Sequence, residues 1–192
     1  MRKRVEYWDN LKFILITMVV LTHFLPRVTT FWKCVYDYIF LFHMPLFIFV
    51  SGVFYKKERI RERVISFTFI GIVYNILLYF WDVVLLGNES DFFIFGATKI
   101  PWFAYCIAIC TLVSYVLRDC NKWLVLLMGF MVGCFVGYDT HVTKYLLLSN
   151  TISYFPLFWL GTMINKEEFC VRLSKIRCRK LLGGGYLWQL LL

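Results

Sequence analysis

The stretch at residues 9–24, DNLKFILITMVVLTHF, decides the class of this protein. With its flanks, its apolar run approaches the roughly 20 residues that cross a bilayer as a helix. A lysine, Lys12, stands near one end of the run, and a histidine, His23, lies near the other. Ionisable residues inside membrane helices usually face a partner or a cavity. We therefore expect a membrane helix that carries two polar positions, one near each end.

The rest of the chain has the same apolar character. Of its 192 residues, 60% are hydrophobic, whereas soluble domains are about half apolar. The apolar residues form blocks separated by basic segments, so we predict an all-α, polytopic transmembrane bundle of about six helices plus a partial seventh. The six predicted spans are 13–25, 39–55, 64–86, 102–117, 123–138 and 145–164, and the seventh begins at Leu181. The fourth and fifth blocks have only 16 residues each, which is short for a membrane span, so their boundaries are poorly defined.

The net charge of +9 has an uneven distribution along the chain. Seventeen of the 21 Lys and Arg residues fall in segments on one side of the predicted membrane, and only Arg27, Lys33, Lys99 and Lys144 fall on the other. Basic residues concentrate on the cytoplasmic side of membrane proteins. This pattern predicts a cytoplasmic N-terminus in a multi-pass protein of the plasma (inner) membrane. The charge orients helices in the lipid bilayer, and we expect no nucleic acid partner.

The seven cysteines do not form a metal-binding pattern. No Cys-x-x-Cys pair or Cys/His cluster has the spacing of a zinc site. Most of the cysteines lie in predicted spans or on the reducing side, where free cysteine behaves as a small buried hydrophobe. We therefore expect no metal.

Lys12 and His23 share one face of the first helix. Their offset of 11 residues brings them within about 20° of each other around the helix axis, and about 16 Å apart along it. Lys12 has a simple alternative explanation, because a lysine at the membrane edge can extend its amine into water. A neutral His23 bonded to a neighbouring helix is the corresponding alternative for the histidine.

A second histidine, His43, lies in the next predicted span, which runs back toward the cytoplasm. It stands 12 residues before the inner end of that span, and His23 stands ten residues from the inner start of its own. At about 1.5 Å per residue, the two histidines should lie at similar depth. This juxtaposition favours a functional pair.

Four motifs in order carry a resemblance to a known family. They are DNLKFILITMVVLTHF, FLFHMPLFIFVSG, IPWFAYCIAI and SYFPLFWLG. Together they resemble the integral-membrane acyltransferase-3 family, and specifically its fucose 4-O-acetylase-like branch. The family signature is a basic residue and a histidine separated by ten residues on the first helix, and Lys12 and His23 match it. The third span lacks the early proline that is common in the family.

The resemblance implies a membrane O-acyltransferase. Such an enzyme moves an acetyl group from acetyl-CoA, its acyl donor, to a hydroxyl of a cell-surface or exported carbohydrate. His23 is then the candidate general base, since histidine has a suitable pKa. Lys12 would bind the donor phosphates and Asp9 would orient Lys12 as an i,i+3 pair. His43 could orient His23, bind the acceptor or stabilise the developing oxyanion.

The resemblance extends to Gly161, and family members are usually longer than this chain. We therefore assign residues 1–165 to the N-terminal part of a membrane acyltransferase domain, 166–180 to a basic cytoplasmic segment and 181–192 to an atypical or truncated tail. An inactive truncated fragment is one alternative, as is a chain that self-associates or needs a missing C-terminal half. A transporter with a His23–His43 proton relay is another, but it predicts more acidic residues within the spans.

Three further features have simple structural interpretations. Ser51 precedes a glycine, and such a pair favours close helix packing over an acyl-serine intermediate. Asn75 lies deep in the third span and is suited to a hydrogen bond between helices. The basic run KKERIRER is expected to form a solvated loop.

Overall fold

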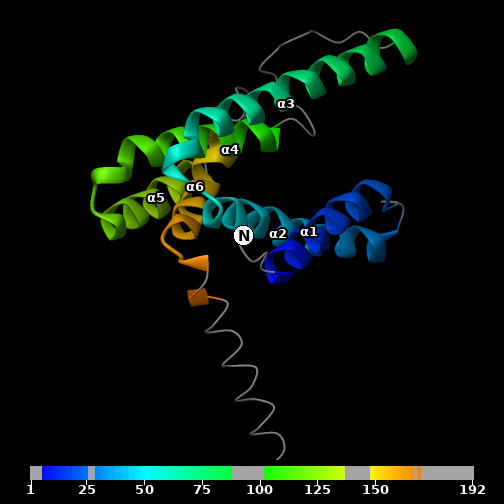
Figure 1. Cartoon of the computed structure of the whole chain (residues 1–192). Coiled ribbons are helices and arrows are strands. Elements are labelled where there is room, and N and C mark those ends of the chain that lie inside the picture. Colours follow the sequence, from blue (N-terminus) through cyan, green and yellow to red (C-terminus); the bar gives the residue numbers. More distant parts are fainter. Residues whose placement is uncertain (1–5, 26–28, 88–101, 137–147, 167, 170–192) are drawn as a thin grey trace, which may run out of the picture.

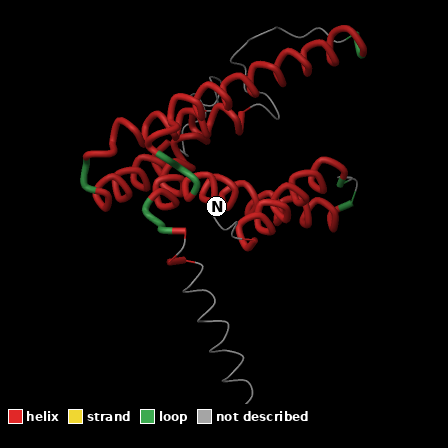
Figure 2. Tube along the Cα trace, viewed as in Figure 1, coloured by secondary structure: helices red, strands yellow, loops and turns green. Residues whose placement is uncertain are grey.

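The structure is a computed structural model that describes residues 6–25, 29–87, 102–136, 148–166 and 168–169. Within these ranges every regular element is a helix, as Figure 2 shows. The six α-helices of the described part are α1 (Glu6–Phe24), α2 (Thr30–Val53), α3 (Ile60–Phe80), α4 (Trp102–Val116), α5 (Lys122–Val136) and α6 (Leu148–Thr162). Three short helical segments are η1 (Lys57–Arg59), η2 (Trp81–Leu85) and η3 (Leu117–Asp119). The predicted all-α class is confirmed for these ranges, and the seventh helix from Leu181 lies outside them.

Helix α6 occupies the centre of the arrangement and packs against α2, α4 and α5 (Figure 1). α1 packs on α2, and α3 packs on α4, with the far part of α3 extending beyond the other helices. The main core lies between α2, α4 and α6. Its buried residues are Met44, Ile48, Trp102, Tyr105, Cys106, Ile107, Cys110 and Phe158.

Two glycines allow α2 and α6 to meet at very close range. A Cβ atom added at Gly52 would overlap the backbone carbonyl of Phe158, and one at Gly161 would overlap the carbonyl oxygen of Phe49. Small residues at helix crossings in membranes permit this kind of backbone contact. The predicted packing role of the Ser51-Gly52 pair agrees with this contact, and Ser51 itself is buried.

A polar bond joins α3 to α4. The Nδ2 of the buried Asn75 donates to the hydroxyl oxygen of Tyr105 at 3.2 Å, as predicted for an interhelical asparagine. Gly71 faces the same tyrosine, because a Cβ at this position would lie 2.7 Å from the Tyr105 ring. Tyr105 therefore fixes the position of α3 along α4.

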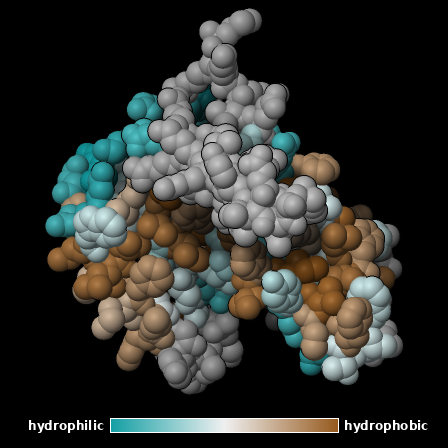
Figure 3. Space-filling view, turned by 90° about the horizontal axis from the view of Figure 1, so that it is seen from below, coloured by the Kyte–Doolittle hydropathy of each residue, from teal (hydrophilic) through white to brown (hydrophobic). Residues whose placement is uncertain are grey.

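A separate buried cluster joins α1 to α2. It consists of Trp8 and Leu15 from α1 and of Val50 and Val53 from α2. The opposite face of α1 is apolar but exposed, with Phe13 at 71% exposure. Broad apolar areas are also visible in the surface view of Figure 3. Such surfaces suit a lipid environment, because soluble proteins rarely expose large contiguous apolar patches.

Three helices of the described part are long and apolar enough to cross a membrane, judged by length and composition. They cover Thr30–Val53, Lys57–Val84 and Trp102–Asp119, and Lys122–Val136 is a shorter apolar helix. α1 does not meet this test, and polar residues interrupt its first turns. The total of six crossings and the cytoplasmic N-terminus stay predictions.

The predicted starts of the first three helices are wrong in the structure, because α1 begins at Glu6 and not at 13, and α3 begins at Ile60 and not at 64. α2 begins at Thr30, nine residues before the predicted 39, with the Thr29 hydroxyl accepting from the Trp32 amide at 3.5 Å. Lys33 and Asp37 broke the apolar run in the sequence, but they are exposed on the helix surface, where they are tolerated.

The run KKERIRER, predicted to be a solvated loop, contains η1 and the start of α3. Its last residue, Arg63, donates from Nη2 to the Ser51 carbonyl at 2.7 Å. The guanidinium also lies 5.7 Å from the ring centroids of Phe67 and Phe158. Arg63 therefore joins the start of α3 to the end of α2.

Candidate functional site

The first part of the candidate site lies at the start of α1. Trp8, Leu15 and Thr22 recur every seven residues on this helix and are all buried, so one stripe of α1 faces the protein. Lys12 lies beside this stripe, with its side chain 37% exposed. The amine is therefore partly shielded from solvent and within reach of protein groups.

Lys12 contacts two side chains. Its Nζ lies 3.5 Å from the ring centroid of Phe54, directly after α2, and 4.0 Å from Oδ1 of Asp9. The predicted i,i+3 pair between Asp9 and Lys12 is present at that distance. A cation over an aromatic face is attracted by the ring quadrupole. The ring of Phe54 therefore helps to fix the position of the amine. A lysine that extended freely into solvent would lack this contact.

A second cation reaches the same ring. The Nζ of Lys166, which follows α6, lies 4.0 Å from the centroid of Phe54. Trp8 lies edge-on to Phe54 at 5.8 Å and stacks with Phe169 at 5.6 Å. We call Trp8, Lys12, Phe54, Lys166 and Phe169 the Phe54 cluster. It brings together α1, the end of α2 and the segment after α6.

The Phe54 cluster contains an unpaired hydrogen-bond donor. Among the described residues, the buried Nε1–H of Trp8 has no hydrogen-bond acceptor. A buried polar group without a partner destabilises the folded protein unless a ligand or water satisfies it. The unpaired N–H of Trp8 can therefore be satisfied by an anionic group that binds beside the amines of Lys12 and Lys166.

A hollow of about 340 Å³ adjoins the cluster. Its lining consists of Phe54, Lys56, Arg59, Glu62, Arg63 and Ser66. Three of these residues are basic and one is acidic, so the lining adds to the positive charge on this end of the molecule. Burial raises the pKa of the nearby Tyr55 hydroxyl above its ordinary value, against the opposing charge of Arg118.

The second part of the candidate site is His43, in the middle of α2. Its side chain is only 2% exposed. The Nδ1 lies 2.7 Å from the carbonyl oxygen of Ile39, and the ring is edge-on to Phe40 at 5.5 Å. A carbonyl oxygen can only accept, so Nδ1 carries the proton of this bond. In the neutral imidazole, Nε2 is then the nitrogen with a lone pair.

His23 lies in the last turn of α1, and its side chain is outside the described part. Its backbone position can be compared with that of His43 along the two helices. His23 is 11 residues from Lys12, and His43 is 11 residues from Phe54, the residue whose ring Lys12 contacts. At about 1.5 Å per residue, each histidine position lies about 16 Å from that contact. The similar depth of the two histidines stays a prediction.

Several residues of this site were not predicted from the sequence. Neither Phe54 nor Lys166 could be recognised as a site residue from sequence pattern, because their contacts join segments that are far apart in the chain. Trp8 was not predicted as a site residue either. Within the described ranges, no group of three or more His, Cys, Asp or Glu side chains could hold a metal ion.

The fold and the site define a helical membrane protein with a basic, aromatic site at one end of a helix pair and histidine positions farther along it. A family model described as an acyltransferase domain matches residues 5–183. The chain therefore belongs to the acyltransferase-3 family of membrane acyltransferases. No curated protein and no solved structure matches the chain.

Proposed function

We propose that this chain is an O-acetyltransferase of the fucose 4-O-acetylase-like branch. It would transfer an acetyl group from acetyl-CoA to a hydroxyl of a cell-surface or exported carbohydrate. The observation that carries the proposal is the pair of lysines, Lys12 and Lys166, on the ring of Phe54. This positive site lies about 16 Å along α1 from His23.

The Phe54 cluster is proposed to bind the phosphates of acetyl-CoA. Ammonium groups form short, charge-assisted bonds with phosphate oxygens. Lys12 and Lys166 supply two such groups, and the Nε1–H of Trp8 supplies a donor. Asp9 limits the mobility of Lys12 through their ion pair. The basic hollow beside Phe54 extends the surface that can accept further phosphate charge.

His23 is proposed as the general base. As it removes the proton from the acceptor hydroxyl, the hydroxyl oxygen attacks the thioester carbonyl carbon. The new C–O bond forms, the C–S bond breaks, and the thiolate of CoA leaves. A positioned general base typically accelerates such a step by about 10² to 10⁴.

His43 is proposed to support this step from α2. Its Nδ1–H is engaged by the Ile39 carbonyl, which fixes the ring orientation. The Nε2 lone pair can then accept a hydrogen bond from the acceptor hydroxyl or from the His23 ring. Stabilisation of the oxyanion would need a donor at Nε2, so the tautomer set by Ile39 argues against that role for neutral His43.

The proposed setting is the plasma (inner) membrane, with the N-terminus and the Phe54 cluster on the cytoplasmic side, where acetyl-CoA is available. The bilayer surrounds the apolar helices. A second copy of the chain, or a separate membrane chain, is a proposed partner on the acceptor side.

The proposal is tested with membranes that contain the full chain and acetyl-CoA carrying a radioactive acetyl group. We expect label to enter envelope carbohydrate through ester bonds that mild alkali cleaves. Membranes without the chain provide the control. A failure to transfer label to any carbohydrate, while the protein is inserted and folded, would contradict the proposed function.

A further inference from the structure

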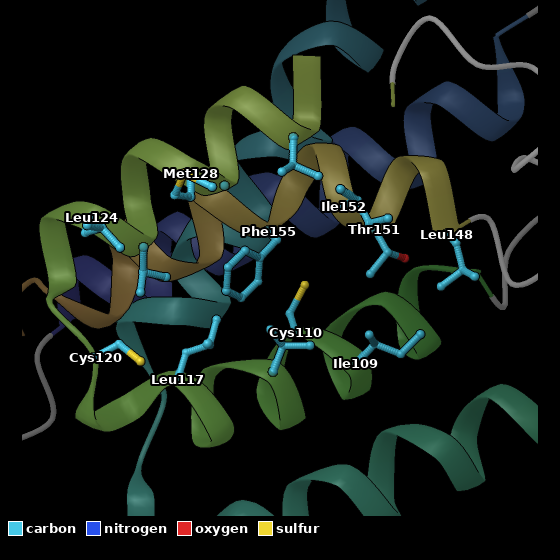
Figure 4. A pocket seen from close by; sticks show the side chains of 14 residues that line it. Ile109, Cys110, Leu117, Cys120, Leu124, Met128, Leu148, Thr151, Ile152 and Phe155 are labelled. Carbon is cyan, nitrogen blue, oxygen red and sulfur yellow. The ribbon is translucent and has the colours of Figure 1, made fainter. Parts of the chain in front are cut away.

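A pocket between α4, α5 and α6 lies away from the Phe54 cluster. Its volume is about 430 Å³, which is within the range of about 300–1,000 Å³ that is typical of small-molecule sites. Figure 4 shows side chains from the three helices converging on this space, among them Ile109, Met128 and Phe155. Apolar atoms and two cysteine side chains make up nearly all of the lining. The pocket is therefore suited to hydrocarbon and poorly suited to a sugar or a nucleotide.

The pocket is elongated along the helices. Along α4 and the first residue of η3, its lining extends from Ile109 to Leu117, a rise of about 12 Å. α5 and α6 run antiparallel beside it, because Ser149 Oγ donates to the Val136 carbonyl at 3.3 Å and Trp159 Nε1 donates to the Lys122 carbonyl at 3.0 Å. Leu148 therefore marks one end of the pocket and Leu117 marks the other. This shape fits a single extended chain parallel to the helices.

One polar group lines the pocket near its Leu148 end. Thr151 is 3% exposed, and its Oγ1 has no hydrogen-bond partner among the described residues. In Figure 4 the hydroxyl oxygen of Thr151 points into the space between α6 and α4. Buried hydroxyls in helices usually bond to a carbonyl of the preceding turn, as Thr111 does to Ile107 at 2.7 Å. Thr151 is thus a free donor at one end of an otherwise apolar pocket.

We propose that this pocket binds one ester-linked acyl chain of a membrane glycerolipid. The ester carbonyl accepts a hydrogen bond from Thr151 Oγ1, and the methylene chain runs from Thr151 toward Leu117. The site is open to the lipid phase beside α5, where Leu124 and Met128 are 60% and 53% exposed. A bilayer lipid can therefore enter sideways. A chain in this position fills a void that well-packed interiors do not leave empty.

The proposal is tested with the purified full chain in detergent and two phosphatidylglycerol probes. One probe has ester-linked chains and the other has ether-linked chains, which lack the carbonyl. Native mass spectrometry measures the fraction of protein that carries lipid. We expect the ester probe to bind about five-fold more tightly, the effect of one net hydrogen bond. Thr151→Val should remove this preference while Thr151→Ser keeps it.

A matched pair on α5 tests the location. Met128 lines the pocket and Met131 does not, although both are exposed on the same helix. Met128→Trp should fill the pocket and lower the binding of both probes several-fold, and Met131→Trp should leave binding unchanged. Equal binding of the two probes by the unaltered protein would overturn the proposal, as would equal losses in the two Trp variants. If Met128→Trp changed the oligomeric mass instead, the pocket would be an interface between copies.

Discussion

Two regions of the α1–α2 pair differ in exposure and in chemistry. At one end, Lys12 is 37% exposed and meets Lys166 at the ring of Phe54. About 16 Å along the pair, His43 is 2% exposed and bonded to a backbone carbonyl. Charge that solvent can reach suits the capture of a soluble anionic donor. A buried imidazole with a fixed tautomer suits proton transfer. Under the proposed function, the helix pair would separate donor binding from chemistry.

The largest expected effect comes from the histidine end. His23→Ala should lower acetyl transfer by about 10² to 10⁴, because the acceptor hydroxyl loses its general base. The measurement is kcat for labelled transfer in membranes with matched amounts of protein. Membrane insertion should be unchanged. Acetyl transfer by His23→Ala at close to the rate of the unaltered protein would show that His23 is not the general base.

The next largest effect is on stability and concerns the close contact between Gly161 of α6 and the backbone of α2. Gly161→Ala should lower the stability of the folded protein by about 1–3 kcal/mol, because the new methyl group meets the backbone of α2. Gly129→Ala is the matched control, since the nearest atom to its new Cβ is the side-chain Cγ of Pro156 at 3.3 Å. Thermal unfolding in detergent compares the two. Equal stability of both variants would contradict the close crossing of α2 and α6.

Removal of the Lys12 amine should mainly weaken the binding of the acyl donor. Lys12→Ala should raise the KM for acetyl-CoA by about ten-fold, the value of one charge-assisted bond, with a small change in kcat. Lys12→Arg should restore part of the affinity because it keeps the charge. An unchanged KM in Lys12→Ala would mean that the lysine only extends to the membrane surface.

The smallest expected effect is that of Asp9→Asn. The ion pair of Asp9 with Lys12 is long, at 4.0 Å, and its two side chains are 47% and 37% exposed. Such a pair contributes only a few tenths of a kcal/mol. The KM for acetyl-CoA should therefore change by less than about two-fold. A change as large as that of Lys12→Ala would show that Asp9 has a direct role in donor binding.

The sequence predicted the features that depend on local pattern. The apolar blocks indicated the helical class, and α4 begins at the predicted Trp102. The i,i+3 pair of Asp9 and Lys12 and the bond of Asn75 also followed from position along a helix. Helix periodicity alone determines which residues share a face, so these expectations needed no knowledge of tertiary packing.

The Phe54 cluster could not be predicted in this way. Its members come from residues 8 to 169, and only the packing of α2 on both α1 and α6 brings them together. The early start of α2 was missed for a different reason. Exposed polar side chains such as Lys33 interrupt an apolar pattern without interrupting the helix itself.

The central claim is that α1 binds the donor through Lys12 and performs the chemistry through His23. Equilibrium dialysis with a non-transferable acetyl-CoA analogue tests it most directly, on the unaltered chain, Lys12→Ala and His23→Ala in detergent. The account predicts that Lys12→Ala weakens binding about ten-fold, whereas His23→Ala binds the analogue as the unaltered chain does. Full affinity in Lys12→Ala, or a loss confined to His23→Ala, would contradict this division.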